Sequence, residues 1–222
     1  MKNILEIACF NVESALIAAK AGAQRIEFCT DFSTGGLTPS LEDTKKILSV
    51  VNIPVFIMIR PRSGNYVFTD TEFLHFNEWI PKFKAIGVHG FVFGLLNDDC
   101  TINTEKSKEL VQLALPLPCT FHRAFDTGPD LSKSLEDVIA CGFKRLLTSG
   151  GAGNAIDNVP SLIALAKQAG DRLIILPGGG VRSSNIETLK SISTHEFHTS
   201  AITKGGEIAD ADEIKKTFEL LK

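Results

Sequence analysis

The sequence predicts an α/β fold, a single-domain (β/α)8 barrel of the TIM type that spans residues 1–222. The first observation is a repeated unit, in which a short apolar, β-branched run precedes a segment of helical period; eight such units of about 25–30 residues fill the chain. The second is that no low-complexity linker or shift in composition divides the sequence. The third is that the first turn, CFNVES, has no glycine, whereas an open doubly wound sheet usually has its glycine-rich turn there.

Each expected strand is a short run of β-forming residues that ends at a turn. The expected ranges are, in order, 4–9, 25–30, 54–60, 90–96, 118–124, 144–149, 173–177 and 196–202. A helix follows each strand, and the last helix is expected over about 210–221. Parallel strands joined by helices bring all eight carboxyl ends to one mouth, where such barrels have their active sites.

Several helices have sequence signals at their ends. A capping box, in which two side chains satisfy free amides of the first turn, is predicted for three helices. The pairs are Ser40 with Asp43, Thr69 with Glu72, and Ser184 with Glu187. Glycine shortly before the next strand marks helix ends, at Gly22, Gly87, Gly142 and Gly170.

Composition excludes some classes of function. Hydrophobic residues make up 44% of the chain and charged residues 22%, as in an ordinary globular protein. A net charge of −3 gives no reason to expect nucleic acid or an anionic membrane as a partner. No apolar run reaches the roughly 18 residues of a membrane span. The five cysteines are odd in number and never form a C-x-x-C pair, which favours reduced thiols and a cytoplasmic location.

The phase of each strand predicts which side chains face the barrel interior. Side chains alternate along a strand, and the set that faces the helices must be apolar. In RIEFC, Ile26 and Phe28 therefore face the helices. The same reasoning predicts one interior group drawn from five strands: Glu6, Glu27, Arg60, His122 and His198.

This interior group has two interpretations. A single buried Glu or His can pair only to fix strand register, and Glu6, nearest the bottom of its strand, best suits that role. Five such residues together favour a functional pocket, because an unpaired buried charge costs several kcal/mol and clustered titratable groups are what acid–base chemistry uses.

The stretch CTFHRAFD, residues 119–126, ends the fifth strand with three groups able to carry charge. Asp126 in this stretch either orients Arg123 or caps the loop. With the interior group, the stretch completes the set of candidate catalytic residues. They are Glu27, Arg60, His122, Arg123, Asp126 and His198.

Two glycine-rich turns, TSGGAG after the sixth strand and PGGGV after the seventh, suit an anion. Glycine lets backbone amides approach an anion closely, and barrels of this type often bind phosphate near strands 7 and 8. Tight turns alone would also explain the glycines. Arg182 and the end of the eighth strand could complete the site. The candidate substrate- and anion-binding residues are Arg62, Ser149, Gly150, Gly151, Gly178, Gly179, Gly180 and Ser200.

Eight segments follow one another in the order found in a known family. They are RIEFC, GGLTPS, IPVFIMIRPRSG, FVFGLL, TFHRAFD, RLLTSGGA, ILPGGGVR and EFHTSA, and they cover nearly the whole chain. Together they resemble the CutC family, long labelled copper homeostasis proteins. The resemblance implies a cytoplasmic (β/α)8 barrel that forms a homodimer or higher homo-oligomer. It also implies a link to copper handling, with Cu(I) as the one cofactor.

Copper(I) prefers thiolate and thioether ligands. Members of the family often have one cysteine in strand 1, in a form like EVCVDS, and another in strand 2, in a form like ELC. This sequence keeps Cys29 in the second, but EIACFN has Ala8 at the first position and moves the cysteine to Cys9. The strand phase places Cys9 on the helix side, so Cys29 is the one metal ligand expected, alone or with Met58 and His122.

Two functions therefore remain open. One is copper homeostasis with copper binding, as the resemblance implies. The other is an enzyme acting on a small anionic or polyhydroxylated substrate, in which Glu27 and His122 share acid–base work and the glycine turns bind the anion. Both require a small-molecule or metal partner at the mouth. A metal at Cys29 would favour the first, and a phosphate or sulfate at the glycine turns would favour the second.

Overall fold

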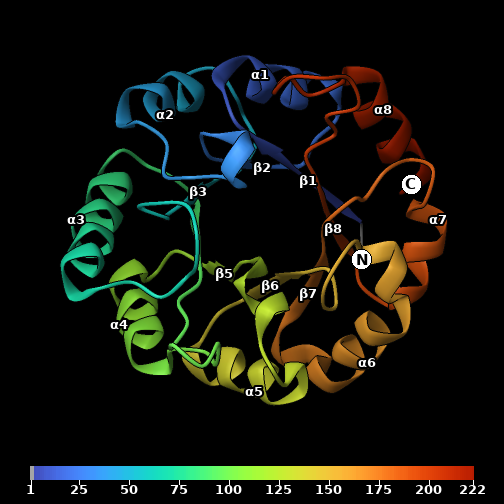
Figure 1. Cartoon of the computed structure of the whole chain (residues 1–222). Coiled ribbons are helices and arrows are strands. Elements are labelled where there is room, and N and C mark those ends of the chain that lie inside the picture. The colour runs from blue at the N-terminus through green and yellow to red at the C-terminus, as the bar shows by residue number, and fades with distance from the viewer. Residues whose placement is uncertain (1–2) are drawn as a thin grey trace.

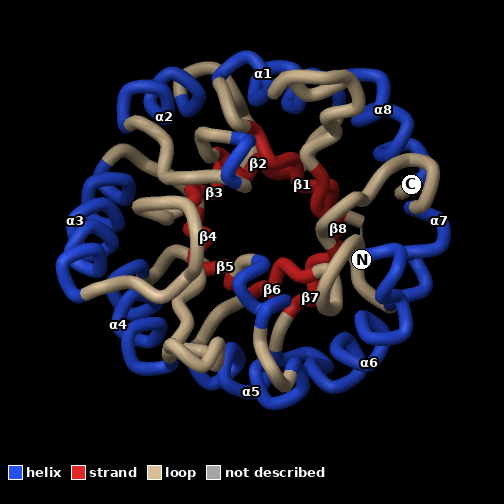
Figure 2. Tube along the Cα trace, in the orientation of Figure 1, coloured by secondary structure: helices blue, strands red, loops and turns tan. Residues whose placement is uncertain are grey.

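Eight parallel strands form the inner wall of a barrel and eight α-helices its outer wall in the computed structural model, which describes residues 3–222 (Figure 1). The strands are β1 (Ile4–Cys9), β2 (Arg25–Phe28), β3 (Val55–Met58), β4 (Gly90–Phe93), β5 (Cys119–Phe121), β6 (Arg145–Thr148), β7 (Ile174–Pro177) and β8 (Glu196–Thr199). The hydrogen-bonded order runs from β7 back to β1 and on to β8. At the seam, β8 lies beside β7 and completes the ring (Figure 2). The predicted barrel is confirmed.

The helices are α1 (Val12–Ala21), α2 (Leu41–Leu48), α3 (Asp70–Ala85), α4 (Thr104–Ala114), α5 (Leu131–Cys141), α6 (Val159–Ala169), α7 (Ile186–Leu189) and α8 (Ala211–Leu220). None of the helices in the described part of the chain is long and apolar enough to cross a membrane. Every predicted strand begins within one residue of its expected start. Several end up to three residues early, because residues such as Arg60 leave the ladder for the mouth loops.

Of the three predicted capping boxes, one forms in full and a second forms in part. Thr69 and Glu72 form the reciprocal box at α3, and Ser40 accepts a hydrogen bond from the Asp43 amide at α2. The box predicted at Ser184 and Glu187 is wrong. The single-turn helix α7 begins at Ile186. The residue before it is Asn185, and its side chain does not cap the first turn.

The strand phases are confirmed. Leu5, Ile7 and the other helix-facing side chains belong to the large core between strands and helices. A separate interior cluster consists of Cys29, Phe56, Met58 and Val92. The predicted interior charged groups are all buried, and they stack in layers because strand neighbours such as Glu6 and His198 lie in register.

Candidate functional site

The carboxyl ends of the strands surround a cavity of about 240 Å³ at the barrel mouth. Pockets for drug-sized ligands measure about 300–1,000 Å³, so this one suits a small ligand. Of the sequence-predicted site residues, the cavity is lined by Glu27, Arg60, His122, Arg123, Gly179, Gly180, His198 and Ser200. Tyr66, Met58 and Arg182 complete much of the remaining wall.

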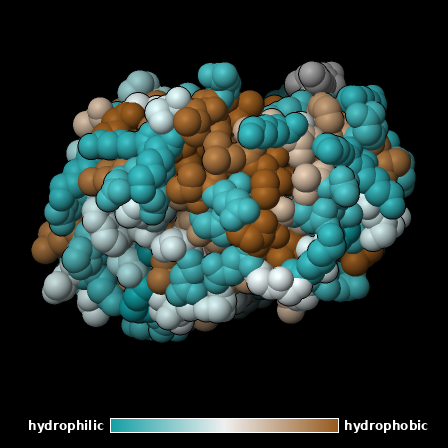
Figure 3. All heavy atoms as spheres, turned by 90° about the horizontal axis from the view of Figure 1, so that it is seen from above, coloured by the Kyte–Doolittle hydropathy of each residue, from teal (hydrophilic) through white to brown (hydrophobic). Residues whose placement is uncertain are grey.

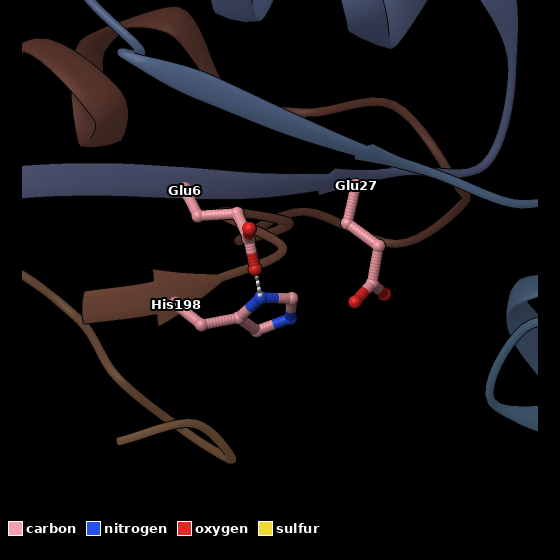
Figure 4. A group of neighbouring side chains, drawn as sticks. All are labelled: Glu6, Glu27 and His198. Atoms are coloured by element: carbon pink, nitrogen blue, oxygen red, sulfur yellow. Dashed lines mark hydrogen bonds and ion pairs between the residues drawn. The ribbon is translucent and has the colours of Figure 1, made fainter. Parts of the chain in front are cut away.

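One wall of the cavity holds a centre formed by Glu6, Glu27 and His198. Their potential ligand atoms all lie within 4.8 Å of one another. The Nδ1 atom of His198 lies 2.7 Å from Glu6 Oε1, and Nδ1 is the donor because a carboxylate only accepts. The other edge of the imidazole, with Nε2, faces Glu27 (Figure 4). Glu27 Oε2 is buried and has no hydrogen-bond partner among residues 3–222.

The two carboxylates of this centre have very different pKa values. Burial would raise the pKa of Glu6, but the Arg25 charge and the His198 hydrogen bond lower it to about 2. Burial, with the neighbouring Glu6 charge, raises the pKa of Glu27 to about 7. Burial alone would lower the pKa of His198, yet the charge of Glu27 and the hydrogen bond to Glu6 raise it above its ordinary value. Glu6 is thus a fixed anion at neutral pH.

Below the centre lies an ionic layer that the sequence analysis missed. Arg25 donates to both Glu6 and Glu196, and Arg145 donates to Glu196 at 2.7 Å. The alternation that places Glu27 inside also places Arg25 inside, two residues earlier on β2, so the signal was present. Glu6 therefore has more than the register role expected of it, since it joins Arg25 to His198.

His122 lines the opposite side of the cavity as a neutral imidazole. Its Nδ1 atom accepts from the Ala124 amide at 3.3 Å, while Nε2 has no partner within the described chain. Burial and the adjacent Arg60 charge lower its pKa to about 3. Nε2 therefore carries the proton and is available to donate to a ligand. The ring packs against Tyr66, with 4.9 Å between ring centroids.

Arg60 and Arg62 were both predicted to face a ligand, and the structure gives them mainly loop contacts. Arg60 donates to the carbonyls of Thr34, Gly36 and Gly64, at 2.9, 3.2 and 3.0 Å. It thereby ties the loop after β2 to the loop after β3, while its side chain still lines the cavity. Arg62 pairs with Glu72 outside the cavity wall. Anion binding by either residue stays a prediction.

Asp126 has both of the roles left open for it. Its carboxylate pairs with Arg123 at 2.9 Å and accepts from the amide and hydroxyl of Ser149. The TSGGAG turn, including Gly150 and Gly151, is thereby anchored to the loop after β5. Asp126, Ser149, Gly150 and Gly151 lie behind the cavity, and their direct action on a ligand stays a prediction.

The second glycine turn reaches the cavity. Gly179 and Gly180 line it with positive φ angles of 96° and 69°, beside Ser200 and Arg182. Gly178 lies behind them, where a Cβ would be 2.4 Å from Leu147. The Arg182 guanidinium donates to Thr199 Oγ1 and to the Val181 and Ile202 carbonyls. The turn exposes backbone to a ligand, as an anion site requires.

Cys29 lies in the interior cluster and is absent from the cavity wall. Its thiol lies 3.5 Å from the Cys9 carbonyl, and burial raises its pKa well above the ordinary value. Cys9 belongs to the helix-side core, so the two side chains do not converge, as predicted. A Cu(I) site needs thiolates or thioethers. The Met58 thioether belongs to the same cluster as Cys29, but the cluster contains no second cysteine, so metal binding at Cys29 stays a prediction.

Comparison with known proteins gives one consistent result. The model of the CutC family matches residues 3–203. The copper homeostasis protein cutC homolog of Homo sapiens is 40% identical over 199 residues, covering 89% of this chain and 73% of the human one. A CutC family protein of Chromobacterium violaceum is 39% identical over 212 residues, covering 95% and 85%.

Solved structures agree. A CutC crystal structure from Streptococcus agalactiae aligns with a TM-score of 0.84 and 32% identity, covering 89% of this chain and 98% of that one. A phosphoribosylanthranilate isomerase from Thermotoga maritima aligns with a TM-score of 0.65 at 14% identity, covering 100% and 98%. The second likeness concerns the fold alone.

Proposed function

The chain belongs to the CutC family, and from this premise we propose that it serves copper homeostasis by binding copper at the barrel mouth. The observation that carries the proposal is the 40% identity over 89% of the chain to a human protein named for copper homeostasis. The cavity supports it, because imidazole and carboxylate groups converge there within a volume of about 240 Å³. In this role copper is the bound cargo.

The oxidation state of the copper follows from the donors. Cys29 makes a poor Cu(I) ligand, because it lies outside the cavity wall and its cluster contains no second thiol. Met58 is the only sulfur-containing residue in the cavity wall described here, and one thioether makes a poor Cu(I) site. Imidazole and carboxylate donors suit divalent copper. We therefore expect Cu(II) to bind more tightly than the thiol-dependent Cu(I) would.

A copper titration of the purified protein tests this function. We expect one Cu(II) ion per chain and no loss of binding in Cys29→Ala. Cu(I) is titrated in parallel under reducing conditions against a competing chelator. Failure of the wild type to bind copper in either state would refute the proposal, and loss of Cu(I) binding in Cys29→Ala would move the copper site to that thiol.

A second function, an enzyme acting on a small anionic or polyhydroxylated substrate, is favoured by His122. His122 is a neutral imidazole of the cavity wall whose buried Nε2 has no partner within residues 3–222, and it is suited to donate a hydrogen bond to a substrate oxygen. Glu27 would accept a proton across the cavity, and the Gly179–Gly180 turn would hold the anion. Thermal-shift measurements with inorganic phosphate and sugar phosphates test it. Stabilisation that disappears in His122→Asn supports this function, and no stabilisation by any of them counts against it.

The cellular setting is also proposed. All five cysteines are free thiols, which suits a reducing cytoplasm. A homo-oligomer is expected from the family, and the outer wall offers apolar surface for it (Figure 3). Exposed apolar side chains include Val50, Leu74 and Leu115. The expected partners are thus copper or another small ligand and further copies of this chain.

A further inference from the structure

We propose that Glu27 and His198 form a binding site for a divalent transition-metal ion, and that Glu6 positions His198 for it. The inference depends on the proposed copper role only for the identity of the ion. Its starting point is geometric, because β1, β2 and β8 bring two carboxylates and an imidazole within 4.8 Å of one another (Figure 4).

The centre has unused ligand capacity at the edge of the cavity. Glu27 is only 3% exposed, and its Oε2 atom has no hydrogen-bond partner among residues 3–222. Buried carboxylate oxygens are nearly always satisfied, so this one indicates a missing cation or ligand. Both Glu27 and His198 line the cavity. An ion between them would have further coordination positions open to the mouth, for water or for a small ligand.

The contacts of Glu6 assign it a supporting role. One carboxylate oxygen holds His198 Nδ1 at 2.7 Å, and the other accepts from Arg25. Metal-binding histidines usually donate their second N–H to a carboxylate, which fixes the tautomer and the ring orientation. Because Nδ1 donates to Glu6, Nε2 is the ring nitrogen directed at Glu27 (Figure 4). An ion bound there would displace any proton on Nε2 and take its lone pair.

The donor set selects the ion. One imidazole nitrogen and carboxylate oxygens suit borderline divalent ions such as Cu²⁺ and Zn²⁺, whereas Cu(I) prefers sulfur. The charges agree, because Arg25 is already shared between Glu6 and Glu196. Among residues 3–222 no Arg or Lys forms an ion pair with Glu27, so a divalent ion beside His198 would supply its cation.

Titration of the metal-free protein with CuCl₂ and, separately, ZnCl₂ tests the site, with electron paramagnetic resonance on the copper form. We expect one ion per chain and one imidazole nitrogen coupled to copper. Glu27→Gln and His198→Asn should weaken binding by at least 10-fold, and Glu6→Gln by about 10–100-fold with the nitrogen coupling retained. The exposed Glu13→Gln and His75→Asn serve as matched controls and should bind as the wild type does.

The outcomes separate this inference from the proposed function. Copper binding that is unaffected in both Glu27→Gln and His198→Asn would overturn the site and leave the copper role standing. Zinc binding lost in these variants, with no copper binding by the wild type, would keep the site and overturn the copper role. Because a buried substitution can unfold the protein, thermal unfolding of each variant is measured first. The nitrogen coupling in the wild type tests the site without any mutation, and its absence from bound copper would refute it.

Discussion

His198 and Glu6 face each other across the neighbouring strands β8 and β1, with 2.7 Å between His198 Nδ1 and Glu6 Oε1. The carboxylate is held from below by Arg25, which is itself only 3% exposed. The imidazole is thus oriented by a chain of buried charges that begins at the bottom of the barrel and ends at the mouth. The predictions below test this arrangement and the parts of the mouth around it.

Arg25→Met is expected to destabilise the fold strongly. It leaves the buried carboxylates of Glu6 and Glu196 without their shared cation, and breaking a buried pair costs about 3–5 kcal/mol. The free energy of unfolding in urea measures the loss. Arg172→Met is the control, because its pair with Glu136 is exposed and its loss should leave the free energy of unfolding nearly unchanged. Similar small losses in both variants would contradict the account of Arg25.

His122 should make the stability fall as the pH is lowered. Its pKa is about 3 in the folded protein and about 6.5 in an unfolded chain. Between these values the unfolded chain binds a proton that the folded one does not, so stability is complete above about pH 6.5 and is lost towards pH 3. Between pH 7 and pH 5 this group should cost the wild type about 2 kcal/mol. Glu27 and His198 titrate in the opposite sense in both proteins, because their pKa values are raised in the folded state. Going from pH 7 to pH 5, the free energy of unfolding of His122→Asn should therefore change by about 2 kcal/mol in the favourable direction relative to the wild type. Equal changes in the two proteins, measured by urea unfolding, would refute this prediction.

Thiol reactivity should separate one cysteine from the other four. Cys100 is partly exposed, whereas Cys9, Cys29, Cys119 and Cys141 are buried. Burial raises the pKa of Cys119 to about 12 and that of Cys141 to about 11, and it raises the pKa values of Cys9 and Cys29 as well. A colorimetric thiol reagent at pH 8 should therefore label one thiol quickly and the rest only after unfolding. Rapid labelling of Cys29 in the folded protein would show that its environment differs from the one described.

Gly94→Ala should displace His122 from the cavity wall. A Cβ at Gly94 would lie 2.6 Å from His122 Nδ1, where no side-chain atom fits. Overpacking of this kind costs about 1–3 kcal/mol, and the NMR signals of the His122 ring should shift. Gly205→Ala is the control, because a Cβ there meets nothing within 4 Å. Equal stability of the two variants would contradict the tight contact.

Much of the barrel could be predicted because its signals are local. Alternating apolar residues such as Ile26 and Phe28 showed which side of β2 faces the helices, and so placed Glu27 inside. In the same way, the apolar Phe197 faces the helices, so its neighbour His198 was placed inside the barrel. These inferences need only the period of a strand.

The partners of the interior side chains could not be predicted, because they depend on contacts distant in sequence. Arg60 looked like a ligand-binding cation, but the loops after β2 and β3 present carbonyls that bind it. The sequence showed that Glu6 lies near the bottom of its strand, which suggested a structural role. It did not show that the Glu6 side chain reaches both His198 and Arg25. The Ser184 cap failed because α7 begins at Ile186, which puts Asn185 rather than Ser184 at the N-cap position.

The central claim is that the mouth holds a divalent ion between β2 and β8. A copper anomalous difference map from crystals of the wild-type protein soaked in CuCl₂ tests it most directly. The account predicts one peak, about 2.0–2.2 Å from His198 Nε2 and from a Glu27 carboxylate oxygen. A peak at Cys29, or a mouth without any peak in a fully soaked crystal, would contradict it.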